Sequence, residues 1–217
     1  MTNVFKTVEK VERKDRLFEI GVQTLQKQGW TISREKGLGK ASVRRITKEG
    51  TSKLVSIRTT QDQWIAFPPK PDGDGWITLD NVDVVLAVSV DDRDSPKAAL
   101  VHWIDAAEMR DRFNRAAKAR RKAGHHVSEK RRGVWLPLYH QDDGQTVRFV
   151  GGGAGIDYPP IAREPLNGGD GSPPRNKLVS SDSPDEGHPP LTILQAKRGL
   201  ALSFGVPESA IKISIEA

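Results

Sequence analysis

Apolar residues recur at helical spacing near the start of the chain. Over residues 11–29, Leu17, Ile20 and Leu25 fall on one face of a helix. Gly29 is placed to end this helix, because glycine readily adopts the left-handed conformation found just past helix ends. The pattern therefore predicts an amphipathic first helix that packs on a core.

Short apolar runs bounded by glycine, proline and aspartate predict strands after this helix. They lie at residues 30–34, 42–47, 54–59, 64–67, 76–92, 98–104 and 133–139. The turn at 48–53 predicts a hairpin, and the apolar run at 82–90 predicts a strand buried on both faces. A basic helix is expected at 105–122, with Asp105 as its N-cap. This order predicts an α/β (α+β) domain over residues 9–150.

The composition changes after residue 150. Residues 151–190 contain eight glycines and eight prolines without an apolar period, which predicts a disordered linker. In residues 191–217, Thr192 and Gln195 have the spacing of a capping box, and alternating isoleucines near the end predict a strand. A helix–strand piece of this size cannot bury its own core. We expect it to dock on the main domain, on a second copy or on a protein partner.

The composition excludes several classes of protein. Hydrophobic residues make up 36% of the chain, and no run approaches the roughly 18 apolar residues of a membrane-spanning helix. The first residues lack the apolar core of a secretory signal. Because the chain has no cysteine, it has no disulfide framework, thiol nucleophile or thiolate metal site. We expect a cytoplasmic protein that does not contact membranes.

The net charge of +6 is concentrated in one segment. Residues 108–132 contain ten basic and three acidic residues, whereas the other 192 residues contain 24 basic and 25 acidic ones. A local basic stripe is typical of a surface that binds a polyanion, although a solvated helix face is the alternative. The candidate phosphate contacts are Arg115, Lys118, Arg121, Lys122, Lys130, Arg131 and Arg132.

Four segments occur in an order that points to a known fold. They are RKDRLFEIGVQTLQKQGWTIS, LVSIRTTQDQWIAF, DNVDVVLAVSVDD and ALVHWIDAAEMRDRF. With these segments, residues 10–115 resemble the core of the PD-(D/E)xK restriction-endonuclease-like superfamily. The resemblance matches Glu19 to the family's helix glutamate and places its aspartate near Ala41 or Ser42. The family's Glu/Gln-x-Lys tripeptide falls on residues 56–58, which here read Ser-Ile-Arg.

The resemblance implies a nuclease fold with a degenerate active site. Glu19 and Arg58 become the candidate catalytic positions, and Arg58 and Gln61 line the former cleft. One acid remains where two or three oxygen ligands would hold Mg²⁺, and arginine does not release a proton as lysine can. The implied function is binding of nucleic acid, in particular double-stranded DNA, by a protein of a mobile element, phage or defence locus.

Two other functions stay open. The chain could be an active Mg²⁺- or Mn²⁺-dependent endonuclease with a migrated site that uses Glu19 with Asp62, Asp80 or Asp83. It could also be a protein-interaction module that captures a partner, or a second copy, through residues 191–217. Outside the nuclease alternative we expect no cofactor, because adjacent histidines at 125 and 126 lack the spacing of metal ligands on a helix.

Overall fold

The computed structural model describes residues 7–35, 42–125, 127 and 133–166, which belong to one compact unit. Its helices are α1 (Val8–Lys27), the 3₁₀ helix η1 (Leu79–Asn81), α2 (Ala106–Lys122) and α3 (Ala154–Asp157). Its strands are β1 (Thr31–Arg34), β2 (Val43–Lys48), β3 (Thr51–Thr60), β4 (Trp64–Phe67), β5 (Val84–Val90), β6 (Ala98–Asp105), β7 (Val134–Pro137) and β8 (Ala162–Pro165).

Six strands form the main sheet, in the order β1-β2-β3-β5-β6-β8. Neighbours are antiparallel except β3 and β5, which run parallel and are connected through β4 and η1. Strands β4 and β7 pair with each other in a separate two-stranded sheet. The prediction of a mixed α/β domain that begins with a helix and an antiparallel meander is therefore confirmed.

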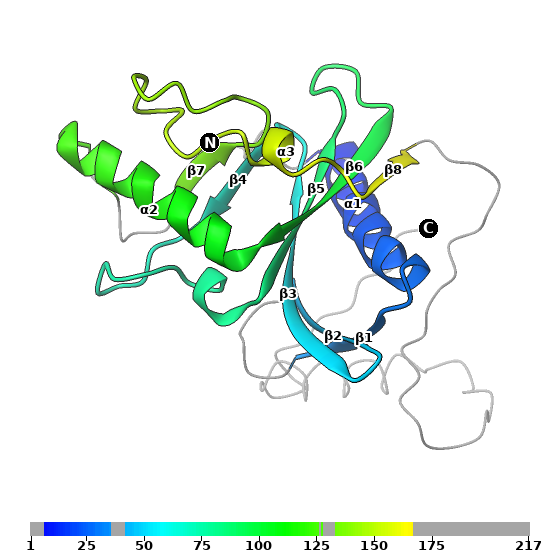
Figure 1. Cartoon of the computed structure of the whole chain (residues 1–217). Coiled ribbons are helices and arrows are strands. Elements are labelled where there is room, and N and C mark those ends of the chain that lie inside the picture. The colour runs from blue at the N-terminus through cyan, green and yellow to red at the C-terminus, as the bar shows by residue number, and fades with distance from the viewer. Residues whose placement is uncertain (1–6, 36–41, 126, 128–132, 167–217) are drawn as a thin grey trace, which may run out of the picture. The chain divides into compact units, whose positions relative to one another are not determined.

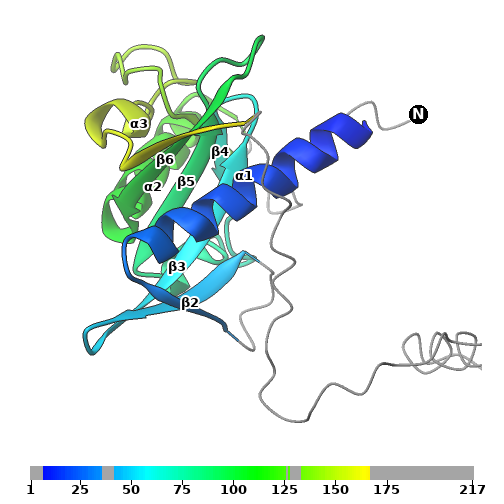
Figure 2. The same cartoon turned by 90° about the vertical axis from the view of Figure 1, so that its right-hand side faces the viewer.

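The two long helices lie on opposite faces of the main sheet (Figure 1). Helix α1 contributes Leu17 and Leu25 to one core, and it runs across β3 and β5 in the turned view (Figure 2). Helix α2 contributes Met109 and Phe113 to the core on the other face, which also contains the inner side of the β4–β7 pair. All seven residues of β5 are buried between these two cores, as its apolar run predicts.

Local signals in the sequence account for several boundaries. The Thr7 hydroxyl accepts a hydrogen bond of 3.3 Å from the Lys10 N–H at the start of α1. The β2–β3 hairpin turns at Glu49 and Gly50, both with positive φ, as tight hairpins require. At the middle of α1, a Cβ on Gly21 would lie 2.9 Å from Val88 Cγ2, so the helix approaches the sheet closely there.

The prediction that Asp105 caps α2 with its carboxylate is wrong. Asp105 occupies the N-cap position, but its side chain makes no capping hydrogen bond. The Ala106 N–H instead donates to the carbonyl of Asp83 at 3.0 Å. The start of α2 is thus held by the backbone that precedes β5.

The prediction that the linker begins at residue 151 is also wrong. Residues 154–157 form α3, and β8 pairs with β6 from Ala98–Pro165 to Val101–Ala162. Glycine here permits close packing: a Cβ on Gly151 would lie 2.4 Å from the carbonyl oxygen of Arg112. The glycines at 151–153 and 155 therefore serve close contacts with neighbouring segments.

The remainder of the predicted linker and the predicted helix–strand piece at 191–217 lie outside the described residues. Within the described part of the chain, the helices lack the combination of length and apolar character that crossing a membrane requires.

Candidate anion-binding pocket

A pocket opens where β3 extends beyond the start of β2. Strand β2 begins with Val43 opposite Ser56, whereas β3 continues to Thr60. The last bond between the two segments runs from the Ile57 N–H to the carbonyl of Ser42, at 2.9 Å. Helix α1 forms the other wall of a space of about 460 Å³. The lining residues are Lys14, Asp15, Phe18, Ser42, Arg44, Ile57, Arg58 and Thr59.

Among the described residues, four buried side-chain atoms of Ser42 and of β3 have no hydrogen-bond partner. They are the hydroxyl oxygens of Ser42 and Ser56 and the Nε and Nη2 atoms of Arg58. Ser56 and Arg58 alternate along β3, so both side chains leave the same face of the strand. Buried polar groups are almost always paired in folded proteins. Ser56 pairs with Val43 and Val85, and Arg58 pairs with Ala87; these three apolar residues belong to the α2 core, so Ser56 and Arg58 point to the α2 side of the sheet. The carbonyl of Ser42, by contrast, accepts from the N–H of Ile57, whose side chain packs in the α1 core.

Arg58 is a largely buried cation that forms no ion pair with a carboxylate of the described residues. Burial lowers the pKa of Arg58 to about 10, so the side chain still carries its charge at neutral pH. Its guanidinium lies over Phe67, whose ring centroid is 4.3 Å from the Arg58 Cζ. A ring quadrupole compensates a desolvated charge only in part, and an anion would compensate it far better.

The rim of the pocket is also basic. Arg44 lies 5.2 Å from the ring centroid of Phe18, and burial and the neighbouring charge of Arg34 lower the pKa of Arg44. Lys14 is exposed on α1, and Asp15 is the single acid among the lining residues. Three cations against one carboxylate give the pocket a positive potential, which favours an anionic ligand.

Several positions that the resemblance assigns meet at this pocket, and others do not. Ser42 and Arg58 both line the pocket, whereas Ser56 is fully buried and does not line it. Glu19 is bound by Arg16 at 3.0 Å and by Gln23 on the surface of α1, and it does not line the pocket. The side chain of Gln61, predicted to contact nucleic acid, binds the carbonyl of Lys10 at 2.7 Å and thereby holds the start of α1.

The acids of the migrated-site alternative support local structure. Asp62 accepts hydrogen bonds from Thr60 Oγ1 and the Trp64 N–H, and Asp83 accepts from the Leu54 N–H at 2.7 Å. Asp80 forms an ion pair of 2.8 Å with Lys70. Among the described residues, no three histidine, aspartate or glutamate side chains are grouped so that they could hold a metal ion.

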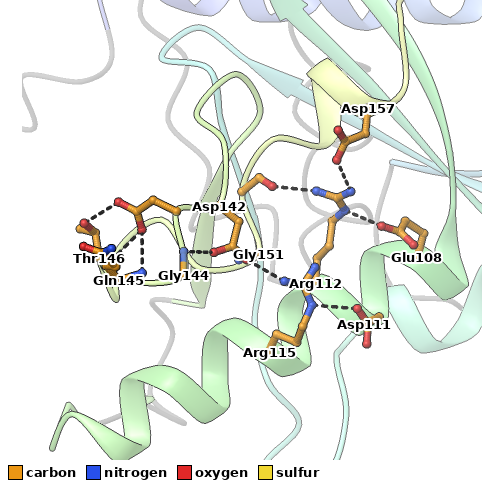
Figure 3. A network of polar contacts seen from close by, with 12 residues as sticks. Glu108, Asp111, Arg112, Arg115, Asp142, Gly144, Gln145, Thr146, Gly151 and Asp157 are labelled. Atoms are coloured by element: carbon orange, nitrogen blue, oxygen red, sulfur yellow. Dashed lines mark hydrogen bonds and ion pairs between the residues drawn. The ribbon is translucent and has the colours of Figure 1, made fainter.

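Part of the basic stripe serves the fold (Figure 3). Arg112 is buried and contacts Glu108, Asp157 and the carbonyl of Gly152, so it connects α2 to the segment around α3. Arg115 contacts Asp111 at 2.9 Å and Asp142 at 2.6 Å. These two arginines are neutralised inside the domain, and Arg115 is therefore a weaker candidate for a phosphate contact than its sequence position predicts.

Two further arginines of α2 bind carbonyl groups. Arg110 donates to the carbonyl of Leu79 at 3.0 Å, and Arg120 donates to that of Trp135 at 2.6 Å. Besides the ion-paired Arg115, the exposed cations of α2 are Lys118, Lys122 and Arg121, which donates to the carbonyl of Gly73 at 3.5 Å. Residues 126 and 128–132, which include Lys130, Arg131 and Arg132, lie outside the described residues.

Sequence reasoning misses the helix side of the pocket. Lys14, Asp15 and Phe18 lie one turn before Glu19 or beside it, in a stretch where nearly every residue is polar. Arg44, one position after Val43 in β2, belongs to no recognisable sequence motif. Only the position of α1 over this part of the sheet brings these residues together, and the position of Arg58 in β3 is the one signal that points to the pocket.

The pocket offers hydroxyl groups and positive charge, and among its described residues a single carboxylate. This arrangement can hold an oxyanion through charge-assisted hydrogen bonds. It does not provide the set of acidic oxygens that a hydrolytic metal centre requires. In comparisons with known proteins, no family model, no curated protein and no solved structure matches this chain.

Proposed function

We propose that this protein binds the phosphodiester backbone of DNA, with one phosphate group held in the pocket at Arg58, and does not cleave it. The observation that carries the proposal is the buried Arg58 guanidinium, whose Nε and Nη2 atoms have no partner. A guanidinium presents its donors in a planar fork that matches the oxygens of a phosphate. Ser42, which also lines this pocket, has a hydroxyl group without a partner among the described residues.

The arrangement of strands supports a sheet of the restriction-endonuclease-like kind. Three antiparallel strands follow the first helix, and the third of them, β3, pairs in parallel with β5. In the resemblance, Ser42 is the family's aspartate position and Ser56 to Arg58 is its Glu/Gln-x-Lys position. Of these positions, Ser42, Ile57 and Arg58 line one pocket, which supports the proposal.

The same positions argue for binding rather than hydrolysis. Serine at 42 and 56 replaces carboxylates with hydroxyl groups, which do not attract a divalent cation strongly. Arg58 supplies a fixed positive charge at the place where a metal ion would otherwise neutralise the phosphate. Asp15 is the only carboxylate of the lining, and one acid does not hold a catalytic metal.

Replacing Arg58 with methionine tests the proposal. We expect the wild-type protein to bind fluorescein-labelled duplex DNA in EDTA, with an affinity that falls steeply with salt. Arg58→Met should weaken binding by about tenfold or more, because a hydrogen bond to a charged group contributes about 1.5–3 kcal/mol. Fluorescence anisotropy at two salt concentrations measures both effects.

The control is Arg163→Met, which removes an exposed arginine from β8 at the other edge of the main sheet. We expect this variant to bind as the wild type does. Arg58→Met should fold at least as stably as the wild type, since it removes an uncompensated buried charge. Equal affinity of the wild type and Arg58→Met for DNA would contradict the proposal.

A further inference from the structure

A second hollow, of about 440 Å³, is bordered by three arginines from separate parts of the chain. Arg93 lies in the loop after β5, Arg120 lies in α2, and Arg148 lies between β7 and α3. The other described lining residues are Asp62, Trp64 and Trp135. We call this space the arginine hollow. It shares no described lining residue with the pocket at Arg58.

The arginine hollow has an excess of positive charge. Arg93 and Arg148 are exposed, and they form no ion pair or hydrogen bond with any described residue. Asp62 is the single acid of the described lining, and it accepts hydrogen bonds from the Thr60 hydroxyl and the Trp64 N–H. Three guanidinium groups against one carboxylate give the hollow a positive potential, which favours an anionic ligand.

Arg120 is the member of the basic stripe that lines this hollow. Its Nη2 donates to the carbonyl of Trp135 at 2.6 Å, and it forms no ion pair with a described residue. Burial lowers the pKa of Arg120, as expected for a cation that no nearby acid compensates. Arg112 and Arg115, by contrast, are paired with acids. A partly desolvated cation of this kind is stabilised when an anion binds beside it.

Aromatic contacts position Arg148 and leave its N–H groups free. Its Cζ lies over the ring of Trp64, 4.8 Å from the centroid, and 5.9 Å from the ring centroid of Phe149. The donors of a guanidinium lie in the plane of the group, so a contact through its face does not use them. Arg148 is thus held at the hollow with its donors available to a ligand.

The loop that carries Arg93 is fixed beside the turn after β3. The Oδ1 atom of Asp92 accepts from the N–H groups two and three residues further on, each at 2.7 Å. The Gln63 side chain donates to the carbonyl of Asp91 at 3.1 Å and connects this loop to the turn. The acid next to Arg93 therefore holds the backbone of the loop and leaves the arginine without an ion pair.

We propose that the arginine hollow binds a second phosphate of the DNA whose first phosphate occupies the pocket at Arg58. Phosphate oxygens accept hydrogen bonds from several guanidinium groups at once, and such charge-assisted bonds are strong. This inference rests on the proposed function, because it assigns a further contact to the same bound backbone. It also gives the basic stripe a role in binding through Arg120, a residue that the sequence does not distinguish from its neighbours.

The two sites are close enough to contact one strand. Thr59 lines the pocket at Arg58, and Asp62 lines the arginine hollow. These residues are three positions apart, which allows at most about 11 Å between their Cα atoms. Successive phosphates of a strand lie about 3.4 Å apart along a duplex axis, so phosphates a few nucleotides apart cover that distance.

Removing the two exposed arginines tests the inference with the labelled duplex. We expect the double variant Arg93→Gln, Arg148→Gln to bind about tenfold more weakly. It should also make the salt slope shallower by about 1, because each phosphate contact contributes about 0.9 to the slope. Arg93→Lys, Arg148→Lys keeps both charges and should keep most of the slope. Anisotropy titrations in EDTA over a range of salt concentrations measure affinity and slope.

The matched control is Lys48→Gln, Lys53→Gln, which removes two cations from the β2–β3 hairpin at the other end of β3. The seven residues of strand from Lys53 to Thr60 span about 23 Å, well beyond the Debye length of about 10 Å at 0.1 M salt. Affinity and slope should therefore stay at the wild-type values. A wild-type slope in Arg93→Gln, Arg148→Gln, or an equal loss in the lysine variant, would overturn the inference.

The acid of the hollow provides a test of opposite sign. Asp62→Asn keeps an oxygen that can accept from Thr60 and Trp64, and it removes a negative charge from the hollow. We expect it to bind the duplex about two- to fivefold more tightly than the wild type. The control Glu49→Gln, at the turn of the β2–β3 hairpin, should bind as the wild type does. Weaker binding by Asp62→Asn would contradict a phosphate at this place.

The outcomes for the two proposals are distinguishable. If Arg58→Met weakens binding and Arg93→Gln, Arg148→Gln does not, the hollow binds no phosphate and the site at Arg58 stands. If the wild type binds no duplex, the proposed function fails, and the inference that rests on it fails too. A triple variant that combines the three substitutions and has a slope shallower by about 2 would support both proposals.

Discussion

Two polar side chains of this domain, His102 and Arg58, differ in whether their buried polar atoms are paired. His102 is completely buried and fully paired: its Nδ1 donates to the carbonyl of Tyr158, and its Nε2 accepts from the hydroxyl of Tyr139, each at 2.7 Å. The Ser89 hydroxyl contacts Tyr139 at 2.6 Å and extends this chain of hydrogen bonds. Arg58, by contrast, has unpaired donors. The first arrangement stabilises the fold, and the second is suited to binding.

His102 should make the protein less stable in mild acid. Burial lowers the pKa of His102 below 6.5, although its hydrogen bond to Tyr158 acts in the other direction. The unfolded chain therefore binds a proton more readily than the folded one, and stability falls as the pH drops below about 6.5. We expect His102→Gln to show a smaller loss of stability between about pH 7.5 and 5.5 than the wild type.

Urea unfolding at both pH values measures this difference. A control variant, His140→Gln, removes an exposed histidine and should keep the wild-type dependence on pH. An identical loss of stability in His102→Gln and in the wild type would show that other groups cause the acid sensitivity.

At the scale of elements, the helices are recognisable from the sequence and their partners are not. The spacing of Leu17, Ile20 and Leu25 predicts α1 and its buried face, and β5 is evident from its apolar run. Strand β8 is not predictable, because it owes its place to the ladder with β6 and to glycine contacts distant in sequence. Likewise, the sequence indicates only the β3 residues of the pocket at Arg58.

A larger residue at position 21 should destabilise the protein, because α1 packs closely against the sheet there. A Cβ at this position would lie 2.9 Å from Val88 Cγ2 and 3.3 Å from Ile57 Cγ2. We expect Gly21→Ala to lower the free energy of unfolding by about 1–2 kcal/mol, because overpacking of about 1–3 kcal/mol exceeds the gain in helix propensity of about 1 kcal/mol. The urea midpoint reports the change.

Gln26→Ala is the matched control, since Gln26 is exposed on the same helix and alanine only improves its helix propensity. It should leave stability unchanged or slightly raised. A stabilised Gly21→Ala variant would mean that α1 can move away from β5 without loss, contrary to the close contact described for this helix.

At the scale of the whole molecule, net charge is a poor guide to where a polyanion binds. Arg110, Arg112, Arg115 and Arg120 contribute to the basic stripe, yet each binds an acid or a carbonyl within the domain. Arg58, which has no ion pair with any described residue, lies in β3, outside the basic stripe. Sequence counts cannot separate these two groups, because the partners are distant along the chain.

The exposed lysines of α2 should affect the salt dependence of DNA binding. For single strands, the logarithm of affinity falls with slope about −0.7 for each phosphate contact. We expect the double variant Lys118→Gln, Lys122→Gln to make this slope shallower by about 1. Titrations over a range of salt concentrations measure the slope.

Lys97→Gln is the control, because Lys97 is an exposed lysine in the loop before β6. It should leave the slope unchanged. If the double variant also has the wild-type slope, the exposed face of α2 is solvated and takes no part in binding.

The short strand β8 should reduce aggregation at high protein concentration. Without it, β6 would present a long apolar edge with unpaired backbone groups, which is a template for pairing with other chains. Strand β8 covers part of this edge with the sequence Ala-Arg-Glu-Pro, and its charged side chains form ion pairs with Asp91 and Lys27. Its final residue, Pro165, has no N–H to donate to a further strand. A segment whose composition predicts a disordered linker thus forms the edge strand of the main sheet, as far as the structure describes the chain, and discourages aggregation.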